Sequence, residues 1–152
     1  MQDRFKFRIW DKHLKKMFDC IQINFTENAY GSNKIKDDEC SIHLIYQPHL
    51  ELMQCSGLKD KNGKLIYEGD ILDLYVSSKK LYRYEVKYEI GSFMLVSQDE
   101  IFDFKNVWND NVYPLSQLYY EYQNEENCID ECEVIGNIYE NPELLEEASN
   151  DN

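Results

Sequence analysis

Apolar and polar residues alternate along several short stretches of this 152-residue chain, which is the pattern of half-buried β-strands. In the clearest stretch one set of residues steps by two between charged neighbours: Tyr82, Tyr84, Val86, Tyr88 and Ile90. We expect this set to face the core, and the charged set to face solvent: Arg83, Glu85, Lys87 and Glu89. Gly91-Ser92 suits a two-residue type II′ turn, so residues 93–96 should return antiparallel.

The same alternation predicts further strands. They are expected to begin near these residues: Phe5, Ile21, Ile42, Leu50, Ile71 and Cys132, the last strand carrying a bulge at Gly136. The first two should form a hairpin or the start of a meander, with Lys6 and Arg8 facing solvent. Residues 26–39 and 97–111 are expected to be loops, because polar and acidic residues interrupt their apolar pattern.

Two short helices are predicted in the last third of the chain. Four apolar residues have helical spacing after Pro114 and predict a helix over residues 115–123: Leu115, Leu118, Tyr119 and Tyr122. Asn141-Pro142-Glu143 supplies an N-cap, a proline for the first turn and an acidic residue, which predicts a helix over residues 142–148. Residues 149–152 should be a disordered tail.

The most distinctive stretch, residues 57–74, contains two predicted turns. Asn62-Gly63 suits a type I′ turn, and Gly69 gives backbone freedom just before the strand that begins at Ile71. Many short strands with small-barrel turn spacing predict a single, mainly β domain with minor helix. We expect a small SH3-like or partly open β-barrel over residues 56–148, beside an N-terminal β subdomain over residues 1–55.

Composition supports a sheet and places limits on location. Twelve Tyr, seven Phe and two Trp favour strands over helices. No apolar run approaches about 18 residues, and a charged N-terminus has no apolar signal core behind it. We therefore expect a soluble cytoplasmic protein without a membrane partner. The five cysteines are an odd number, which predicts reduced thiols and no disulfide.

The net charge of −13 is unevenly distributed. Residues 1–16 carry six basic and two acidic side chains, whereas residues 99–152 carry fifteen acidic side chains against Lys105 alone. Opposite ends could pair between subunits in a head-to-tail homo-oligomer. Alternatively, an acidic surface could mimic a phosphate backbone and occupy a host nucleic-acid-binding protein: Glu125, Glu126, Glu131 and Glu133. The simplest interpretation of the acidic third is a solvated face.

Metal sites have weak support in the sequence. Cys128 and Cys132 have the spacing of a zinc knuckle, but no second close pair completes it beyond three scattered histidines: His13, His43 and His49. The stretch Asp60-Lys61-Asn62-Gly63 fails as a calcium loop, because Leu58 and Gly69 would occupy ligand positions. We expect no metal and no cofactor.

Catalysis and nucleic-acid binding are also disfavoured. Glu68, Asp70 and Asp73 are the acids of the distinctive segment considered for catalysis, and acids beside glycine usually stabilise turns. No nucleophile elbow or phosphate-binding glycine loop is present, so we expect no enzyme. Exposed tyrosines on residues 82–88 could stack on bases, but the net charge repels phosphate.

Three motifs resemble one known family. Residues 56–70 (SGLKDKNGKLIYEGD) resemble the signature of the YopX family of phage and prophage proteins, residues 5–11 with Lys16-Met17 resemble its opening, and residues 133–145 resemble its close. The resemblance implies a phage or prophage accessory protein and brings no activity or catalytic residue to carry over. We interpret the shared residues as structural: Gly57, Leu58, Asp60, Asn62, Gly63, Tyr67, Glu68, Gly69, Asp70, Gly136 and Asn137.

The sequence thus predicts a non-enzymatic protein-interaction or oligomeric module in the cytoplasm of a bacterial host. Its partners would be other copies of itself, or a host or phage protein. Two alternatives stay open at this point. One is a nucleic-acid-associated regulatory protein, and the other is an acidic nucleic-acid mimic that blocks a host protein.

Overall fold

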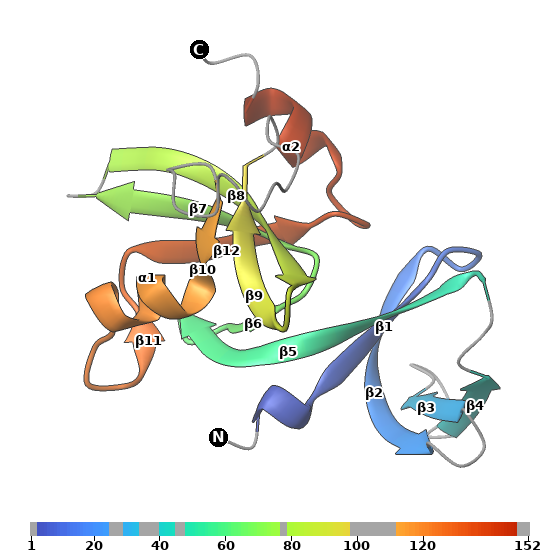
Figure 1. Cartoon of the computed structure of the whole chain (residues 1–152). Helices are drawn as coiled ribbons and strands as arrows, with labels where there is room; N and C mark the ends of the chain where they lie inside the picture. Colours follow the sequence, from blue (N-terminus) through green and yellow to red (C-terminus); the bar gives the residue numbers. More distant parts are fainter. Residues whose placement is uncertain are drawn as a thin grey trace.

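The computed structural model describes residues 3–24, 29–33, 40–44, 48–76, 79–97 and 112–148, which form two β-sheets and two short α-helices (Figure 1). The mainly β fold with minor helix is confirmed, and neither sheet closes into a barrel. Apart from Ser97, the loop expected over residues 97–111 and the tail over residues 149–152 lie outside the described residues.

The first sheet has seven strands and contains the N-terminal half of the chain. They are β1 (Phe7–Asp11), β2 (Lys16–Asn24), β3 (Ala29–Asn33), β4 (Cys40–Leu44), β5 (Leu50–Asp60), β6 (Leu65–Tyr67) and β11 (Cys128–Ile129). Their order is β11-β5-β1-β2-β3-β4, and β6 also pairs with β5. A short 3-10 helix, Asp3–Phe5, precedes β1. The predicted N-terminal hairpin is confirmed, because β1 pairs antiparallel with β2.

The second sheet has five strands, ordered β10-β9-β8-β7-β12. They are β7 (Asp70–Val76), β8 (Lys79–Glu89), β9 (Ser92–Val96), β10 (Val112–Pro114) and β12 (Cys132–Asn137). The register between β7 and β12 shifts between Val134 and Gly136, which confirms the predicted bulge. Both predicted helices form, as α1 (Leu115–Tyr122) and α2 (Glu143–Ala148). In the described part of the chain, neither helix has the length and apolar character needed to cross a membrane.

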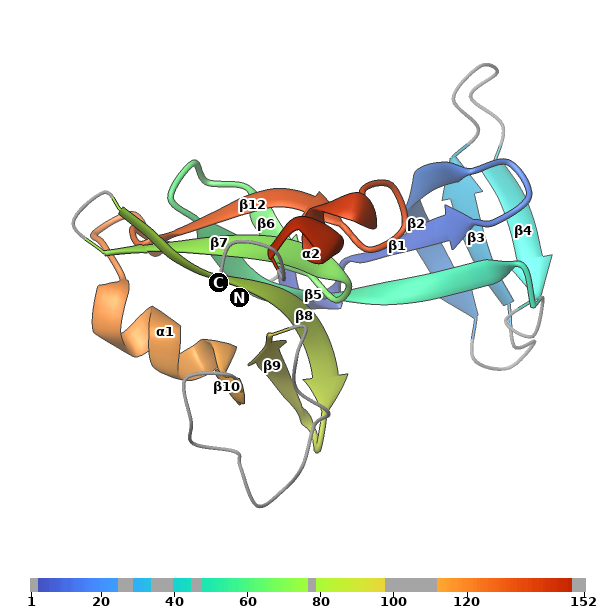
Figure 2. The same cartoon turned by 90° about the horizontal axis from the view of Figure 1, so that it is seen from above.

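Strand β5 is shared by the two parts of the molecule. Its first half pairs with β1, and its second half pairs with β6 and β11. Figures 1 and 2 show it running from the β1–β4 region to the region beneath the second sheet. Just beyond its end, the Lys61 amide donates to the Cys132 carbonyl of β12 at 3.0 Å. The subdomain boundary expected between residues 55 and 56 therefore falls inside a continuous strand.

The main core lies between the second sheet, α1 and the strands β6 and β11. Its buried members are Ile66, Leu72, Leu74, Tyr84, Val86, Leu95, Leu115, Leu118, Ile129, Cys132 and Val134. A smaller cluster in the first sheet contains Ile9 and Leu50, with Cys20, Ile23 and Leu52 packed against it. The predicted helical spacing of α1 is confirmed at Leu115 and Leu118, which both face the main core.

The expectation that every apolar residue of β8 faces the core is wrong at its ends. Tyr84 and Val86 are buried, but Tyr82 and Tyr88 are 44% and 45% exposed, and Ile90 is 54% exposed. The main core covers only the middle of this eleven-residue strand. On the other face, the expectation that Arg83 faces solvent is also wrong, because its side chain is 9% exposed and pairs with Asp73 at 2.6 Å. Alternation carries no information about where the core ends or which part of the outer face is covered.

Both predicted hairpin turns have a different geometry. Glu89 pairs with Ser92, so the loop is Ile90-Gly91, with φ of +53° and +73°, rather than a type II′ turn at Gly91-Ser92. In the other hairpin only Gly63 has positive φ, so the loop is not type I′. There the Asp60 amide donates to the Lys64 carbonyl, which leaves a three-residue loop with glycine in the left-handed position.

The loop expected over residues 26–39 is wrong for its centre, because Ala29–Asn33 forms β3. This strand pairs antiparallel with β2 on one side and β4 on the other. Its sequence is polar and includes glycine, so no alternation of apolar residues marks it. Backbone hydrogen bonds to two neighbouring strands override the low intrinsic strand propensity.

Candidate binding site at the junction of the two sheets

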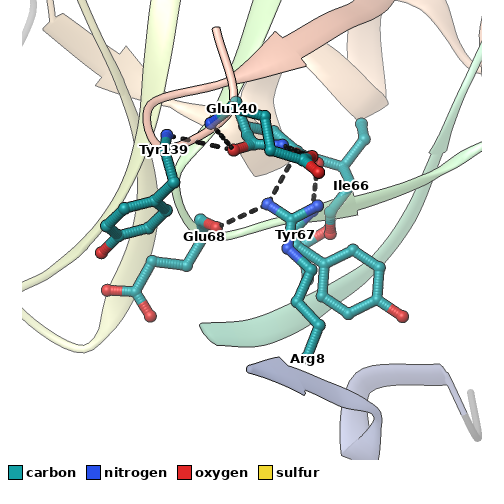
Figure 3. A network of polar contacts seen from close by, with 9 residues as sticks. Arg8, Ile66, Tyr67, Glu68, Tyr139 and Glu140 are labelled. Atoms are coloured by element: carbon teal, nitrogen blue, oxygen red, sulfur yellow. Dashed lines mark hydrogen bonds and ion pairs between the residues drawn. The ribbon is translucent and has the colours of Figure 1, made fainter. Parts of the chain in front are cut away.

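A buried ion pair joins the two sheets where β1 approaches the start of β7. The Nη2 atom of Arg8 lies 2.7 Å from Oδ1 of Asp70, and both side chains are almost fully buried. Arg8 Nη2 also donates to the carbonyl oxygen of Glu68 at 3.1 Å, and the guanidinium stacks on the Tyr67 ring at 4.8 Å (Figure 3). Arg8 was expected to face solvent, and this expectation is wrong. An acid 62 positions away in the sequence supplies its partner.

The carboxylate of Asp70 also organises the turn before it. Its Oδ2 accepts a hydrogen bond from the Tyr67 amide at 2.8 Å. Burial raises the pKa of Asp70, and the nearby Arg8 guanidinium opposes this shift. Between Tyr67 and Asp70, Gly69 has φ of +77°, and its amide donates to the Val86 carbonyl of β8 at 2.8 Å. The Tyr67–Asp70 stretch of the signature therefore serves as a structural joint.

Asp60 has a comparable role at the far end of β5. Its side chain is fully buried, and its Oδ1 accepts hydrogen bonds from the Asn62 and Lys64 amides, each at 2.9 Å. Its Oδ2 accepts from the Val134 amide of β12, also at 2.9 Å. One carboxylate thus shapes the β5–β6 loop and fastens it to the second sheet.

The remaining signature residues also have structural contacts. Asn137 Oδ1 accepts from the amides of Tyr139 and Glu140, which turns the chain after β12. A Cβ atom on Gly136 would lie 2.6 Å from Oδ1 of Asn141. At Gly57, with φ of +82°, a Cβ atom would lie 3.1 Å from Cβ of Arg4. These close approaches explain why glycine occupies both positions.

A groove with a volume of about 220 Å³ opens beside this junction. Residues of β5, the β6–β7 turn, β8 and the segment after β12 line it: Glu51, Leu52, Met53, Glu68, Gly69, Glu85, Val86, Lys87, Tyr88, Glu89, Ile138 and Tyr139. Four glutamates therefore share a small space with two tyrosines. The structure brings them together from segments up to 88 positions apart, a distance that local patterns do not bridge.

The negative charge in the groove is only partly compensated. Glu51 pairs with Lys12 at 2.5 Å, and Glu85 pairs with Lys87 at 3.4 Å. Within the described residues, Glu68 and Glu89 have no ion-pair partner. Burial raises the pKa of Glu68, and the neighbouring carboxylates of Glu89, Glu51 and Glu85 raise it further. The groove therefore carries an excess of negative charge.

Tyr139 forms an aromatic side of the groove. Its ring stacks on Trp10 of β1 with centroids 5.7 Å apart, so the first sheet fixes its position. Burial raises the pKa of Tyr139 to about 12, and the groove carboxylates Glu51, Glu68 and Glu85 contribute to this shift. In Figure 3 the side chain of Glu68 points away from Arg8 and lies on the Tyr139 side.

The acidic residues singled out in the sequence lie elsewhere. Glu125 and Glu126 are exposed in the segment between α1 and β11. Glu131 precedes β12, where its carbonyl accepts a hydrogen bond from the Tyr75 amide. Glu133 pairs with Lys61 at 2.6 Å, and this contact lowers the pKa of its carboxyl. Part of the expected acidic surface is therefore already neutralised within the chain.

The basic N-terminal segment is also partly neutralised. Lys6 pairs with Asp3 at 2.7 Å, Arg8 pairs with Asp70, and Lys12 pairs with Glu51. The formal charge of residues 1–16 therefore overstates what a partner would meet.

Cys128 and Cys132 are buried free thiols, as is Cys55, whereas Cys20 is half-buried. Burial raises the pKa of the Cys132 thiol to about 12 and also raises that of Cys55. Such thiols are poor metal ligands because the thiolate is the binding form. Within the described residues, one group has a metal-binding arrangement, and it contains neither cysteine: Asp11, His13 and His49.

Comparison with known proteins agrees with the motifs in the sequence. The family described as YopX protein matches residues 6–146. No curated protein matches the chain. A crystal structure of protein EF1440 from Enterococcus faecalis is 28% identical, with a TM-score of 0.52, over 92% of this chain and 96% of that one.

The crystal structure of protein yopX from Bacillus subtilis has the same fold. It gives a TM-score of 0.54 at 20% identity, over 93% of this chain and 98% of that chain. The family match covers all three motifs almost completely, and it includes the Arg8–Asp70 ion pair and the turn that Asn137 stabilises. The chain therefore belongs to the YopX family.

Proposed function

We propose that this chain is a non-enzymatic protein-interaction module whose junction groove receives a cationic side chain from a partner protein. The observation that carries the proposal is the presence of four glutamates and two tyrosines around one small groove. Glu68 and Glu89 supply its uncompensated charge, as described above.

The chemistry of the groove suits arginine or lysine. A guanidinium can form charge-assisted hydrogen bonds with a carboxylate and can also stack on an aromatic face. The volume of about 220 Å³ is below the roughly 300–1,000 Å³ typical of small-molecule pockets, but one long side chain fits. A bound cation would offset the mutual repulsion of the carboxylates. It would therefore also lower the pKa of Glu68 towards its ordinary value.

Other functions find less support in the groove. Asp70, one of the acids considered for catalysis, is engaged by Arg8 and by the Tyr67 amide. Negative charge around the groove repels phosphate and therefore disfavours nucleic acid at this face. We propose that the module is an accessory protein of a phage or prophage and that it acts on a protein in the host cytoplasm.

A second copy of the chain is one partner that this proposal includes. Basic side chains such as Lys15 and Lys16 lie in the exposed β1–β2 turn region and could enter the groove of a neighbour. Light scattering at low and high salt tests this version. We expect an oligomer that dissociates at high salt, whereas a monomer under both conditions would restrict the proposal to other proteins.

The groove itself is tested with a defined cationic probe. We expect a six-residue arginine peptide to bind at low salt in isothermal titration calorimetry, and a six-residue citrulline peptide not to bind. The double variant Glu68→Gln/Glu89→Gln should lose about tenfold in affinity, because it removes both uncompensated charges. The matched control is Glu125→Gln/Glu126→Gln, which removes the same charge from an exposed segment and should change affinity by less than about twofold.

Equal losses in the two variants would show that the peptide responds to net charge and would refute the groove as the site. Unchanged binding in the groove variant would refute it as well.

A further inference from the structure

Two histidines and one aspartate meet at the edge of the first sheet, away from the junction groove. Asp11 ends β1, His13 lies in the following turn, and His49 directly precedes β5. The potential ligand atoms of the three side chains all lie within 4.8 Å of one another. The two imidazole rings are stacked, with centroids 4.4 Å apart and an interplanar angle of 2°.

The backbone holds these three residues together. Asp11 pairs with Leu50 in the β1–β5 ladder, so His49 is brought next to the β1–β2 turn. The Lys12 amide donates to the His49 carbonyl at 2.8 Å, which extends this pairing by one hydrogen bond. The juxtaposition of the two histidines therefore follows from the strand register and does not depend on side-chain packing.

Asp11 is oriented as a ligand would be. Its side chain is buried, and its Oδ1 accepts hydrogen bonds from the His13 and Leu14 amides at 2.8 and 2.9 Å. These contacts engage Oδ1 and leave Oδ2 as the oxygen available to a metal ion. Ligating carboxylates are commonly held by such second hydrogen bonds, which fix their direction.

The donor set selects a class of metal. Two imidazoles and one carboxylate suit Zn²⁺ and its neighbours in the first transition series, whereas Ca²⁺ and Mg²⁺ prefer oxygen donors alone. Tetrahedral zinc with bonds of about 2.0–2.1 Å brings its ligand atoms to roughly 3.3 Å from one another. His13 is exposed on a turn, so rotation of its side chain can close the remaining gap.

Nearby charges moderate the expected affinity. Lys12 is adjacent, but its ammonium pairs with Glu51 and also donates to the Pro48 carbonyl. Lys16 faces Asp11 across the hairpin, and Lys15 lies in the same turn. These cations oppose a divalent ion, whereas the buried carboxylate favours it.

We propose that Asp11, His13 and His49 bind one divalent transition-metal ion, best fitted by Zn²⁺, with a fourth coordination position open to solvent. The ion would clip the β1–β2 turn to the start of β5. This inference is independent of the groove, since none of the three ligands lines it.

The proposal is tested on chelator-treated, tag-free protein of the full chain. We expect calorimetry with zinc to give one equivalent per chain, and cobalt to give the visible absorption of a tetrahedral site without the near-ultraviolet band of thiolate ligation. At a hundredfold excess over Kd, zinc should raise the Tm by roughly 5 °C.

The variants His13→Ala and His49→Ala should each abolish stoichiometric binding and the rise in Tm. His13 is exposed, so its variant should fold normally. The third histidine provides the matched control, because His43→Ala should bind zinc as the parent does. A cobalt spectrum with thiolate bands, or binding that survives His13→Ala, would each overturn the proposal.

Discussion

At the scale of single residues, unusual backbone conformations lie in turns and, at Gly57, inside β5 where its register with β6 shifts. Four glycines have positive φ, at positions 57, 63, 69 and 91, where a side chain would be strained. Ile90 also has positive φ, at +53°, although it is β-branched and 54% exposed. A β-branched residue in this region is rare and strained, since its Cβ approaches the following carbonyl.

Relief of this strain should stabilise the protein. The variant Ile90→Asn suits the first position of a turn with positive φ at both residues and should add about 1 kcal/mol to the free energy of unfolding. Ile90→Val is the matched control, because it stays β-branched and should give no gain. Urea denaturation measures both, and an Ile90→Asn protein no more stable than Ile90→Val would contradict the argument.

At the scale of elements, apolar alternation and helical spacing predicted most of the strands and both helices. The β1–β2 hairpin, β8 with β9, and α1 were all predictable because their patterns are local. Strand β3 was missed because its polar sequence depends on its two neighbours. The burial of Arg8 was missed for a related reason, since its partner Asp70 is remote in the sequence. The groove glutamates were not identified as a set, as four separate segments supply its lining.

The Asp60 side chain holds the β5–β6 loop in shape and fastens it to β12. Asp60→Ala would leave three amides without an acceptor, those of Asn62, Lys64 and Val134, and should cost about 3 kcal/mol or more. Asp60→Asn keeps one oxygen for the loop but turns an NH₂ group towards the Val134 amide, so an intermediate loss is expected. Thermal unfolding ranks the two variants.

The matched control for Asp60 is Asp130→Ala, which removes an exposed acid whose side chain accepts a hydrogen bond from Asn124. This variant should lose less than about 1 kcal/mol. An Asp60→Ala protein as stable as Asp130→Ala would mean that water replaces the carboxylate, and the role given to Asp60 would be wrong.

At the scale of the whole molecule, contacts at the end of β5 and one buried ion pair connect the first sheet to the second. At the end of β5, the Asp60 side chain and the Lys61 amide bond to β12. The Arg8–Asp70 pair joins β1 to the start of β7, and the Trp10–Tyr139 stack joins β1 to the segment after β12. The groove lies beside these contacts, so its shape depends on how firmly the sheets are joined. These residues all lie within residues 6–146, the range that the family matches.

The ion pair can be tested as the element that holds the sheets together. Arg8→Met removes one buried charge and leaves Asp70 unpaired, which should cost about 3–5 kcal/mol. Lys6→Met is the matched control, because it removes a cation from a neighbouring pair whose lysine is 55% exposed, and it should cost less than about 1 kcal/mol. The double variant Arg8→Met/Asp70→Leu should recover most of the loss, since well-packed apolar residues often replace a buried pair without penalty.

Denaturation in urea, followed by tryptophan fluorescence in a Trp108→Phe background, reports the contact between the sheets, because the remaining Trp10 stacks on Tyr139. In Arg8→Met we expect the fluorescence transition to move to lower urea than the loss of far-ultraviolet circular dichroism, as the faces separate before the sheets unfold. Coincident transitions together with a loss no larger than that of Lys6→Met would show that the remaining contacts, such as those of Asp60 and Lys61 with β12, hold the two sheets together without the ion pair. The buried pair would then be a consequence of the fold, because the fold would form without it.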